Sequence, residues 1–138
     1  MWSATGAGSF RIKLFDLIDD LNSAHSSENV ESLFVNFLKD EGFETVGARA
    51  IGNPFNDDYL NFPEIYNGPE ELRRIWHKRR YVRNDPTVLR ALTTQSPFLW
   101  TQHDAKTPIG KRILYDAADF GLKEGIACLL YTSDAADE

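Results

Sequence analysis

The sequence predicts an α+β fold in which helices pack on the faces of a mainly antiparallel sheet. Segments with apolar residues at helical spacing are interspersed with short apolar runs of strand type, and glycine or proline bounds most of these runs. The predicted order is helix, helix, strand, strand, helix, short helix, strand, helix, strand. This order is typical of one sheet covered by helical layers.

The first part of the chain is expected to form two helices. Residues 1–9 are small and glycine-rich and predict a loose start. Residues 10–24 carry an apolar stripe of Phe10, Leu14, Leu17, Ile18 and Leu21. A second helix begins at a Ser26-Ser27 cap, ends at Gly42 and should bury a face made of Val30, Leu33, Phe34, Phe37 and Leu38.

Two strands and a third helix are predicted next. Residues 43–51 place Val46, Ala48 and Ala50 on one face of a strand. A second strand over residues 60–66 contains Pro63, which confines it to an edge or a bulge. Pro69 and two acidic residues open the third helix, whose inner face carries Leu72, Ile75, Trp76 and Arg79.

The outer face of the third helix is basic, with Arg73, Arg74, His77, Lys78 and Arg80. Such a cluster is typical either of a nucleic-acid contact or of a solvated helix surface. The solvated surface is favoured because Glu70, Glu71 and Asp85 flank the cluster and no aromatic residue interrupts it.

The stretch from Tyr81 to Trp100 is the most informative part of the chain. Asp85 before Pro86 predicts a short helix with an aspartate N-cap and proline at its first position, and Phe98-Leu99-Trp100 predicts a brief strand. Thr107-Pro108 then starts a helix with an inner face of Ile109, Ile113, Ala117 and Phe120, which Gly121 ends before a last strand from Gly125.

Composition limits the functions that the chain can have. Its 138 residues are 42% hydrophobic, which suits one domain with a core, and no apolar run is long enough to span a membrane. The net charge of −6 argues against nucleic-acid binding by bulk electrostatics. His77, His103 and Asp104 lack metal-ligand spacing and no nucleophile elbow is present, so we expect neither an enzyme nor a cofactor or metal.

The end of the chain has a different character. Residues 128–138, which include the single cysteine Cys128, look like a translated sequencing adapter; the alternative is a disordered acidic terminus. We therefore expect a domain over residues 1–127 and an artefact tail over residues 128–138. The tail should add at most a short strand extension over residues 128–130.

An ordered set of residues resembles a known family. Asp85-Pro86, Trp100, Phe120-Gly121-Leu122 and Gly125-Ile126 together resemble the signature of LuxR-type autoinducer-binding domains, the sensor halves of quorum-sensing transcription regulators. The resemblance covers roughly residues 10–127. It implies an α-β-α sandwich that holds its ligand between sheet and helices, with the closing strands and last helix missing here.

The resemblance also implies a binding site for an acyl-homoserine lactone or a related small amphiphile. Asp85 would accept the ligand amide N–H, Trp100 would wall the head group, and Gly125 would let the backbone and a helix approach closely. The ligand-binding residues implied for this chain are Tyr66, Leu72, Trp76, Asp85, Thr87, Trp100 and Leu122. Of these, Trp76, Asp85 and Trp100 are expected to converge on one cavity. The less favoured alternative is that the two tryptophans are plain core aromatics.

This sequence departs from the family pattern at three positions. Leu72 and Trp76 stand where the family has tryptophan and tyrosine, and Gly68 replaces a further tyrosine. Leu72 cannot donate a hydrogen bond, whereas the indole N–H of Trp76 could replace the missing donor. Tyr66, two residues before Gly68, could share the pocket face if its strand extends that far.

The family implies a cytoplasmic homodimer that reaches DNA only through a C-terminal helix-turn-helix absent from this chain, without membrane contact. The function expected is the ligand-sensing domain of a quorum-sensing transcription regulator. The alternative is a ligand-free dimerisation module of the same fold, and a small hydrolase or metal enzyme is disfavoured. A filled core would favour the module, and an open pocket would favour the sensor.

Overall fold

The computed structural model describes residues 4–52, 56 and 58–130. The chain divides into two compact units, one formed by Met1–Arg49 and Pro63–Gly68 and the other by Ala50–Phe62 and Pro69–Glu138. Both units combine helices with a small antiparallel sheet, so the α+β class predicted from the sequence is confirmed. Within the described residues the strands form two separate two-stranded sheets, in place of the single sheet expected.

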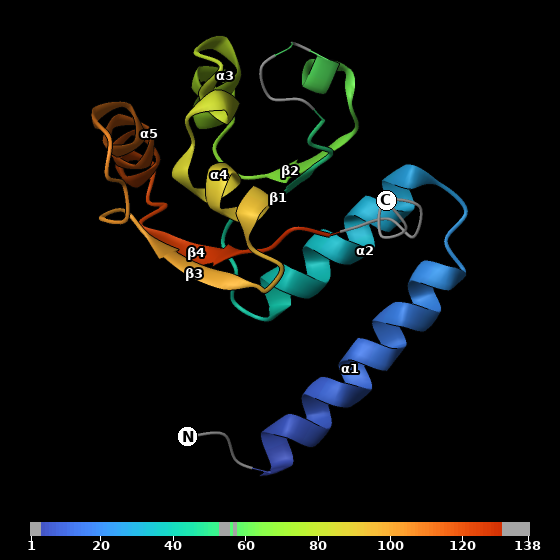
Figure 1. Ribbon diagram of the computed structural model, residues 1–138. Coiled ribbons are helices and arrows are strands. Elements are labelled where there is room, and N and C mark those ends of the chain that lie inside the picture. The colour runs from blue at the N-terminus through green and yellow to red at the C-terminus, as the bar shows by residue number, and fades with distance from the viewer. Residues whose placement is uncertain (1–3, 53–55, 57, 131–138) are drawn as a thin grey trace. The chain divides into compact units, whose positions relative to one another are not determined.

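The first unit contains two helices and one strand pair. Helices α1 (Ala4–Asn22) and α2 (Ser27–Asp40) run in opposite directions and pack against each other (Figure 1). Strands β1 (Val46–Arg49) and β2 (Glu64–Asn67) pair antiparallel, with Val46 opposite Asn67. Pro63 lies just outside β2, where its missing N–H removes no ladder bond.

Helix α1 begins earlier than predicted. The expected loose start over residues 1–9 is wrong from Ala4 onward, because the helix already includes that residue. Each glycine there is about 1 kcal/mol less favourable than alanine in a helix, but a formed helix gains one hydrogen bond with each added residue, and the glycines do not end it. Along the predicted stripe Leu17 and Leu21 are half-buried, whereas Leu14 and Ile18 are exposed.

Helix α2 begins and ends as the sequence predicts. The Ser26 side chain accepts a hydrogen bond from the Asn29 N–H, and Gly42 takes the left-handed conformation that ends the helix. Its most buried residue is Val35, which the periodicity missed, and the predicted core residue Val30 is exposed. Packing therefore selects which part of a broad apolar face is covered.

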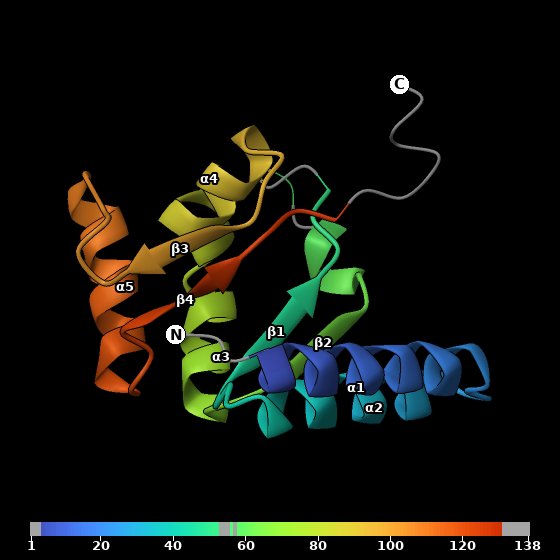
Figure 2. The ribbon, with the colours of Figure 1, turned by 90° about the horizontal axis from the view of Figure 1, so that it is seen from below.

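The second unit carries the remaining elements (Figure 2). After a short 3-10 helix η1 (Asp58–Asn61) come α3 (Glu70–Lys78), a second 3-10 turn η2 (Tyr81–Arg83) and α4 (Pro86–Thr93). Strand β3 (Phe98–Thr101) pairs antiparallel with β4 (Glu124–Ala127), and α5 (Pro108–Asp119) connects them. The predicted Asp85 cap is confirmed, since its side chain accepts from the Thr87 N–H. The helix start predicted at Thr107-Pro108 is confirmed as well, and the Thr107 side chain accepts from the Gly110 N–H.

The buried residues of this unit come from several elements. Val82 is fully buried in η2, Phe98 is buried on β3, and Ile113 and Leu114 are buried on α5. Leu114 was not among the predicted core residues, and the predicted core residue Ile109 is 40% exposed. The buried face of α5 is therefore rotated around the helix axis, by about one residue, relative to the predicted face.

A polar cluster joins η2 to α5 at the end of α3. The buried Tyr81 hydroxyl donates to Asp116 Oδ2 at 2.5 Å and accepts from Arg79 Nη1 at 2.9 Å. Arg79 Nη1 also lies 3.0 Å from Asp116 Oδ2. Burial, and then the hydrogen bond to Asp116, raise the pKa of the Tyr81 phenol.

Tyr81→Phe should lower the free energy of unfolding by about 1–2 kcal/mol, because Asp116 and Arg79 lose a buried partner. A group with a raised folded-state pKa stabilises the fold below its unfolded pKa of about 10 and loses that contribution as the pH rises through the folded value. Urea unfolding should therefore show that the parent protein loses stability as the pH rises above about 10. This alkaline loss should be smaller in Tyr81→Phe. A variant that is as stable as the parent would contradict this.

The basic face of α3 is largely a solvated surface. Arg73 pairs with Glu70 at 3.0 Å and Arg74 pairs with Glu71 at 2.9 Å, each one turn apart on the helix. These exposed pairs offset much of the local positive charge, as the flanking acids predicted.

Two further observations concern where the last strand ends and whether any helix could span a membrane. Strand β4 ends at Ala127, so the strand extension allowed over residues 128–130 is absent, and the part of the tail beyond residue 130 lies outside the described residues. Among the described residues, none of the helices is long and apolar enough to cross a bilayer.

Candidate functional site

The candidate site begins at the N-terminus of α4, where Asp85 is 8% exposed. Its Oδ1 atom accepts from the Thr87 backbone N–H at 2.9 Å and from the Thr87 hydroxyl at 2.6 Å. Its Oδ2 atom accepts from the Trp76 indole N–H at 2.8 Å. Three internal donors thus satisfy the carboxylate that the sequence singles out, and hydrogen bonds to a charged acceptor are strong.

Trp76 reaches Asp85 from the last part of α3. The indole N–H that the sequence offers as a donor to a ligand carbonyl is therefore engaged by Asp85. Leu72, one turn earlier, is 7% exposed and provides only apolar surface. Of the two departures, the one at Trp76 thus forms an internal contact with Asp85.

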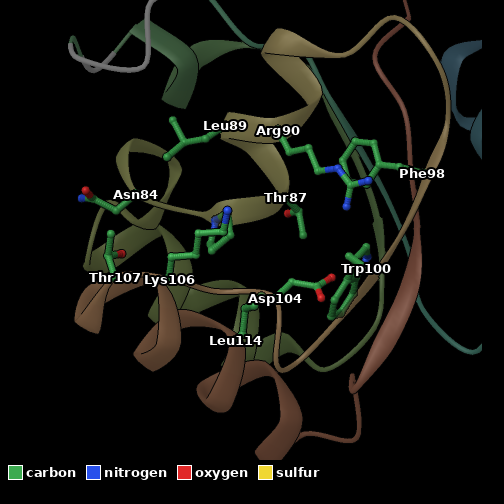
Figure 3. Close-up of a pocket in the computed structure, with 11 residues that line it drawn as sticks. Asn84, Thr87, Leu89, Arg90, Phe98, Trp100, Asp104, Lys106, Thr107 and Leu114 are labelled. Carbon is green, nitrogen blue, oxygen red and sulfur yellow. The ribbon is translucent and has the colours of Figure 1, made fainter.

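A cavity of about 460 Å³ opens beside this pair, within the second unit (Figure 3). That volume is in the range of small-molecule pockets. Strand β3 provides Phe98 and Trp100 and helix α5 provides Leu114, while Thr87, Leu89 and Arg90 project from α4. The remaining lining residues lie in the segments before α4 and α5: Asn84, Pro86, Asp104, Lys106 and Thr107.

The position of Trp100 in the cavity wall depends on Gly125. The two residues are opposite each other in the β3–β4 pair. A Cβ atom at Gly125 would lie 2.7 Å from the Trp100 Nε1 atom and 2.9 Å from Cε2. Gly125 thus lets the indole pack closely against the neighbouring strand. The group that packs on this glycine is a tryptophan ring of β3, in place of the helix that was expected.

The structure separates the predicted ligand-binding residues into groups. Thr87 and Trp100 line the cavity, whereas Trp76 and Asp85 lie beside it, bonded to each other. Leu122 is half-buried in the turn before β4 and does not line the cavity. Its backbone N–H donates a hydrogen bond to the Ala117 carbonyl at the end of α5. Binding by these residues stays a prediction.

Tyr66 belongs to the first unit, on β2. A Cβ atom added at Gly68 would lie 3.0 Å from the Tyr66 hydroxyl oxygen and 2.6 Å from Thr45 Cγ2. The ring of Tyr66 therefore lies next to Gly68, close to the position that the side chain of a larger residue would occupy. A tyrosine at position 68 would have to displace both neighbours.

Sequence reasoning missed three charged residues of the cavity. Arg90 stacks its guanidinium 4.2 Å from the centre of the Phe98 ring and donates to the Leu99 carbonyl. Asp104 accepts from the Thr101 N–H at 2.7 Å and from its hydroxyl at 3.2 Å. Lys106 points from the segment before α5 toward α4 (Figure 3). No sequence motif contains these three residues. Only their location in a loop or on a short helix could have suggested that they lie at a binding site.

Comparison with known proteins gives three findings. The autoinducer binding domain family matches residues 26–135. A segment of 63 residues, 46% of this chain, is 33% identical to the transcriptional activator protein AnoR of Acinetobacter nosocomialis. That segment covers 26% of AnoR, so the chain matches about a quarter of this curated relative.

The fold is similar to that of a solved structure. The N-acylhomoserine lactone dependent LuxR family transcription factor CepR2 from Burkholderia cenocepacia superimposes with a TM-score of 0.72. The identity is 23%, and the match covers 90% of this chain and 71% of that one. This likeness supports the α+β fold expected from the residues.

Proposed function

Because the chain belongs to the autoinducer-binding domain family, we propose that it is the ligand-sensing domain of a quorum-sensing transcription regulator. The family consists of ligand-binding domains of transcription regulators and not of enzymes, in agreement with the sequence. The proposed ligand is an acyl-homoserine lactone or a related small amphiphile. We further propose that the domain acts in the cytoplasm as part of a homodimer whose DNA contacts lie outside this chain.

The observation that carries the proposal is the cavity beside Asp85. An amphiphile needs apolar wall for its chain and a few polar groups to orient its head. Phe98, Trp100 and Leu114 provide apolar wall, and the charged side chains at the margin provide polar contacts. The volume of about 460 Å³ would accommodate a small ligand.

A thermal-shift titration with acyl-homoserine lactones and fatty acids of increasing chain length tests this function. A ligand that binds only the folded state raises the melting temperature by mass action. Leu89→Trp, which adds bulk to the cavity wall, should abolish the shift. Leu92→Trp is the matched control, because Leu92 is similarly exposed on the same helix and does not line the cavity.

The alternative, a ligand-free dimerisation module, is favoured by one observation. Asp85 is already satisfied by Trp76 and Thr87, so no ligand is needed to satisfy the carboxylate. This alternative expects no shift from either ligand series, together with a dimer in sedimentation analysis. A shift that Leu89→Trp removes and Leu92→Trp retains would exclude it.

A further inference from the structure

We propose that Lys106 determines which ligands the cavity prefers, because its ammonium group donates a hydrogen bond to the ring carbonyl of a neutral lactone amide. This inference rests on the proposed ligand-sensing function and adds a contact residue to it. It follows from the charges around the cavity and from the donors that contacts within the protein already engage.

The charged groups around the cavity balance. Arg90 and Lys106 line it as cations, and Asp104 lines it as an anion. Asp85 adds a second carboxylate beside the cavity, immediately before the lining residue Pro86. Two cations and two carboxylates offset each other, so the wall does not favour an ionic ligand. A neutral polar head suits it, held by individual hydrogen bonds and by apolar contacts.

A neutral lactone amide needs both an acceptor and a donor. Its amide N–H can share Asp85 Oδ2, because that oxygen accepts from Trp76 and a carboxylate oxygen can accept from a second donor. Its ring carbonyl only accepts, and a carbonyl that is buried without a donor costs about 1–3 kcal/mol. The residue that supplies this donor therefore decides whether the ring is bound.

Several donors around the cavity are already engaged. The single indole N–H proton of Trp76 and the single hydroxyl proton of Thr87 both go to Asp85, at 2.8 Å and 2.6 Å. The Arg90 guanidinium is held by its stack on the Phe98 ring, 4.2 Å from the ring centre. These groups can reach a ligand carbonyl only by giving up a contact within the protein.

Three other lining donors are less well placed. The Trp100 ring nitrogen packs against Gly125, since a Cβ atom there would lie 2.7 Å from it. The Thr107 hydroxyl oxygen accepts from the Gly110 N–H at 3.1 Å and caps α5. The Asn84 amide is directed away from the other labelled side chains (Figure 3). These orientations favour a donor from elsewhere in the wall.

Lys106 is the lining donor that remains. It lies in the segment before α5, and its side chain is directed toward α4 (Figure 3). It forms no ion pair or hydrogen bond within the described part of the chain. Its ammonium group carries several protons on a flexible stem, so it can adapt to the position of a ring carbonyl. Because the residue is exposed, water competes for the bond and its loss should have a moderate effect.

Calorimetric titration of the full chain with N-octanoyl-homoserine lactone and N-cyclopentyl-octanamide tests the inference. The two ligands share the amide and the acyl chain, and only the lactone has a ring carbonyl. The parent chain should bind the lactone more tightly. Lys106→Met should weaken the lactone about threefold to tenfold, the effect of losing one hydrogen bond, and should change the cyclopentyl amide by less than about twofold. A merely structural role of Lys106 would weaken both ligands alike.

Two further variants complete the comparison. Lys106→Arg keeps a cationic donor and should retain most of the preference for the lactone. Lys111→Met replaces an exposed lysine of α5 outside the cavity, so it is the matched control and should change neither affinity.

Equal binding of the two ligands by the parent chain, or a Lys106→Met effect that is the same for both, would overturn the inference while the proposed sensor function stands. A preference that survives in Lys106→Met and is lost in Asn84→Leu would also overturn it, because the carbonyl would then belong to Asn84. If neither ligand binds the parent chain, the inference and the proposed function both fail.

Discussion

Asp85→Ala is expected to lower the free energy of unfolding by roughly 2–4 kcal/mol. The substitution removes the side-chain cap of α4, which costs about 0.5–2 kcal/mol. It also leaves the Trp76 indole N–H and the Thr87 hydroxyl without their acceptor in a site where Asp85 is 8% exposed, and stranded donors cost about 1–3 kcal/mol. Urea unfolding followed by far-UV circular dichroism measures the change.

Ser26→Ala separates the cost of losing a helix cap from the cost of leaving buried donors without an acceptor. Ser26 caps α2 through a single bond to Asn29 and has no buried indole partner, so its loss should cost only about 1 kcal/mol. The double variant Asp85→Ala with Trp76→Phe should be less destabilised than the sum of the single variants, because they share one hydrogen bond. Strict additivity would show that the bond between Trp76 and Asp85 contributes nothing.

Gly125→Ala should lower the free energy of unfolding by roughly 1–3 kcal/mol and perturb the cavity, the usual range for overpacking. The new methyl group would lie 2.7–3.0 Å from three atoms of the Trp100 indole, a contact that real side chains do not sustain. The ring must therefore leave its place on β4 and change the wall that Trp100 forms. Near-UV circular dichroism should report the ring movement, and urea unfolding should report the stability.

Gly47→Ala is the matched control for this substitution. Gly47 also lies within a two-stranded sheet, but its added Cβ atom would meet only Tyr66 Cδ2 at an ordinary 3.8 Å. Alanine at such a position should be neutral or slightly stabilising, because it restricts the unfolded chain. Equal losses at both positions would mean that the Trp100 contact is unimportant.

Local signals explain why much of the fold could be predicted. Helix starts and ends depend on residues within one turn and can therefore be predicted along the chain. The structure confirms the caps at Ser26 and Asp85, the helix start at Thr107-Pro108 and the helix ends at Gly42 and Gly121. Burial was predicted less well: Val35 and Leu114 are buried where Val30 and Ile109 were expected. The side of an amphipathic helix that is covered depends on its partner, which periodicity does not identify.

The sequence by itself determined the α+β class, the element order and the family, since these depend on periodicity, turn chemistry and an ordered set of residues. Only the tertiary structure decided which side chains of the site contact each other. The bond from Trp76 to Asp85 joins two helices, and the approach of Lys106 and Arg90 to one cavity joins a loop to α4. Neither depends on local spacing: hydrogen bonds and charge pairs between elements exist only when packing brings side chains within a few ångströms of each other.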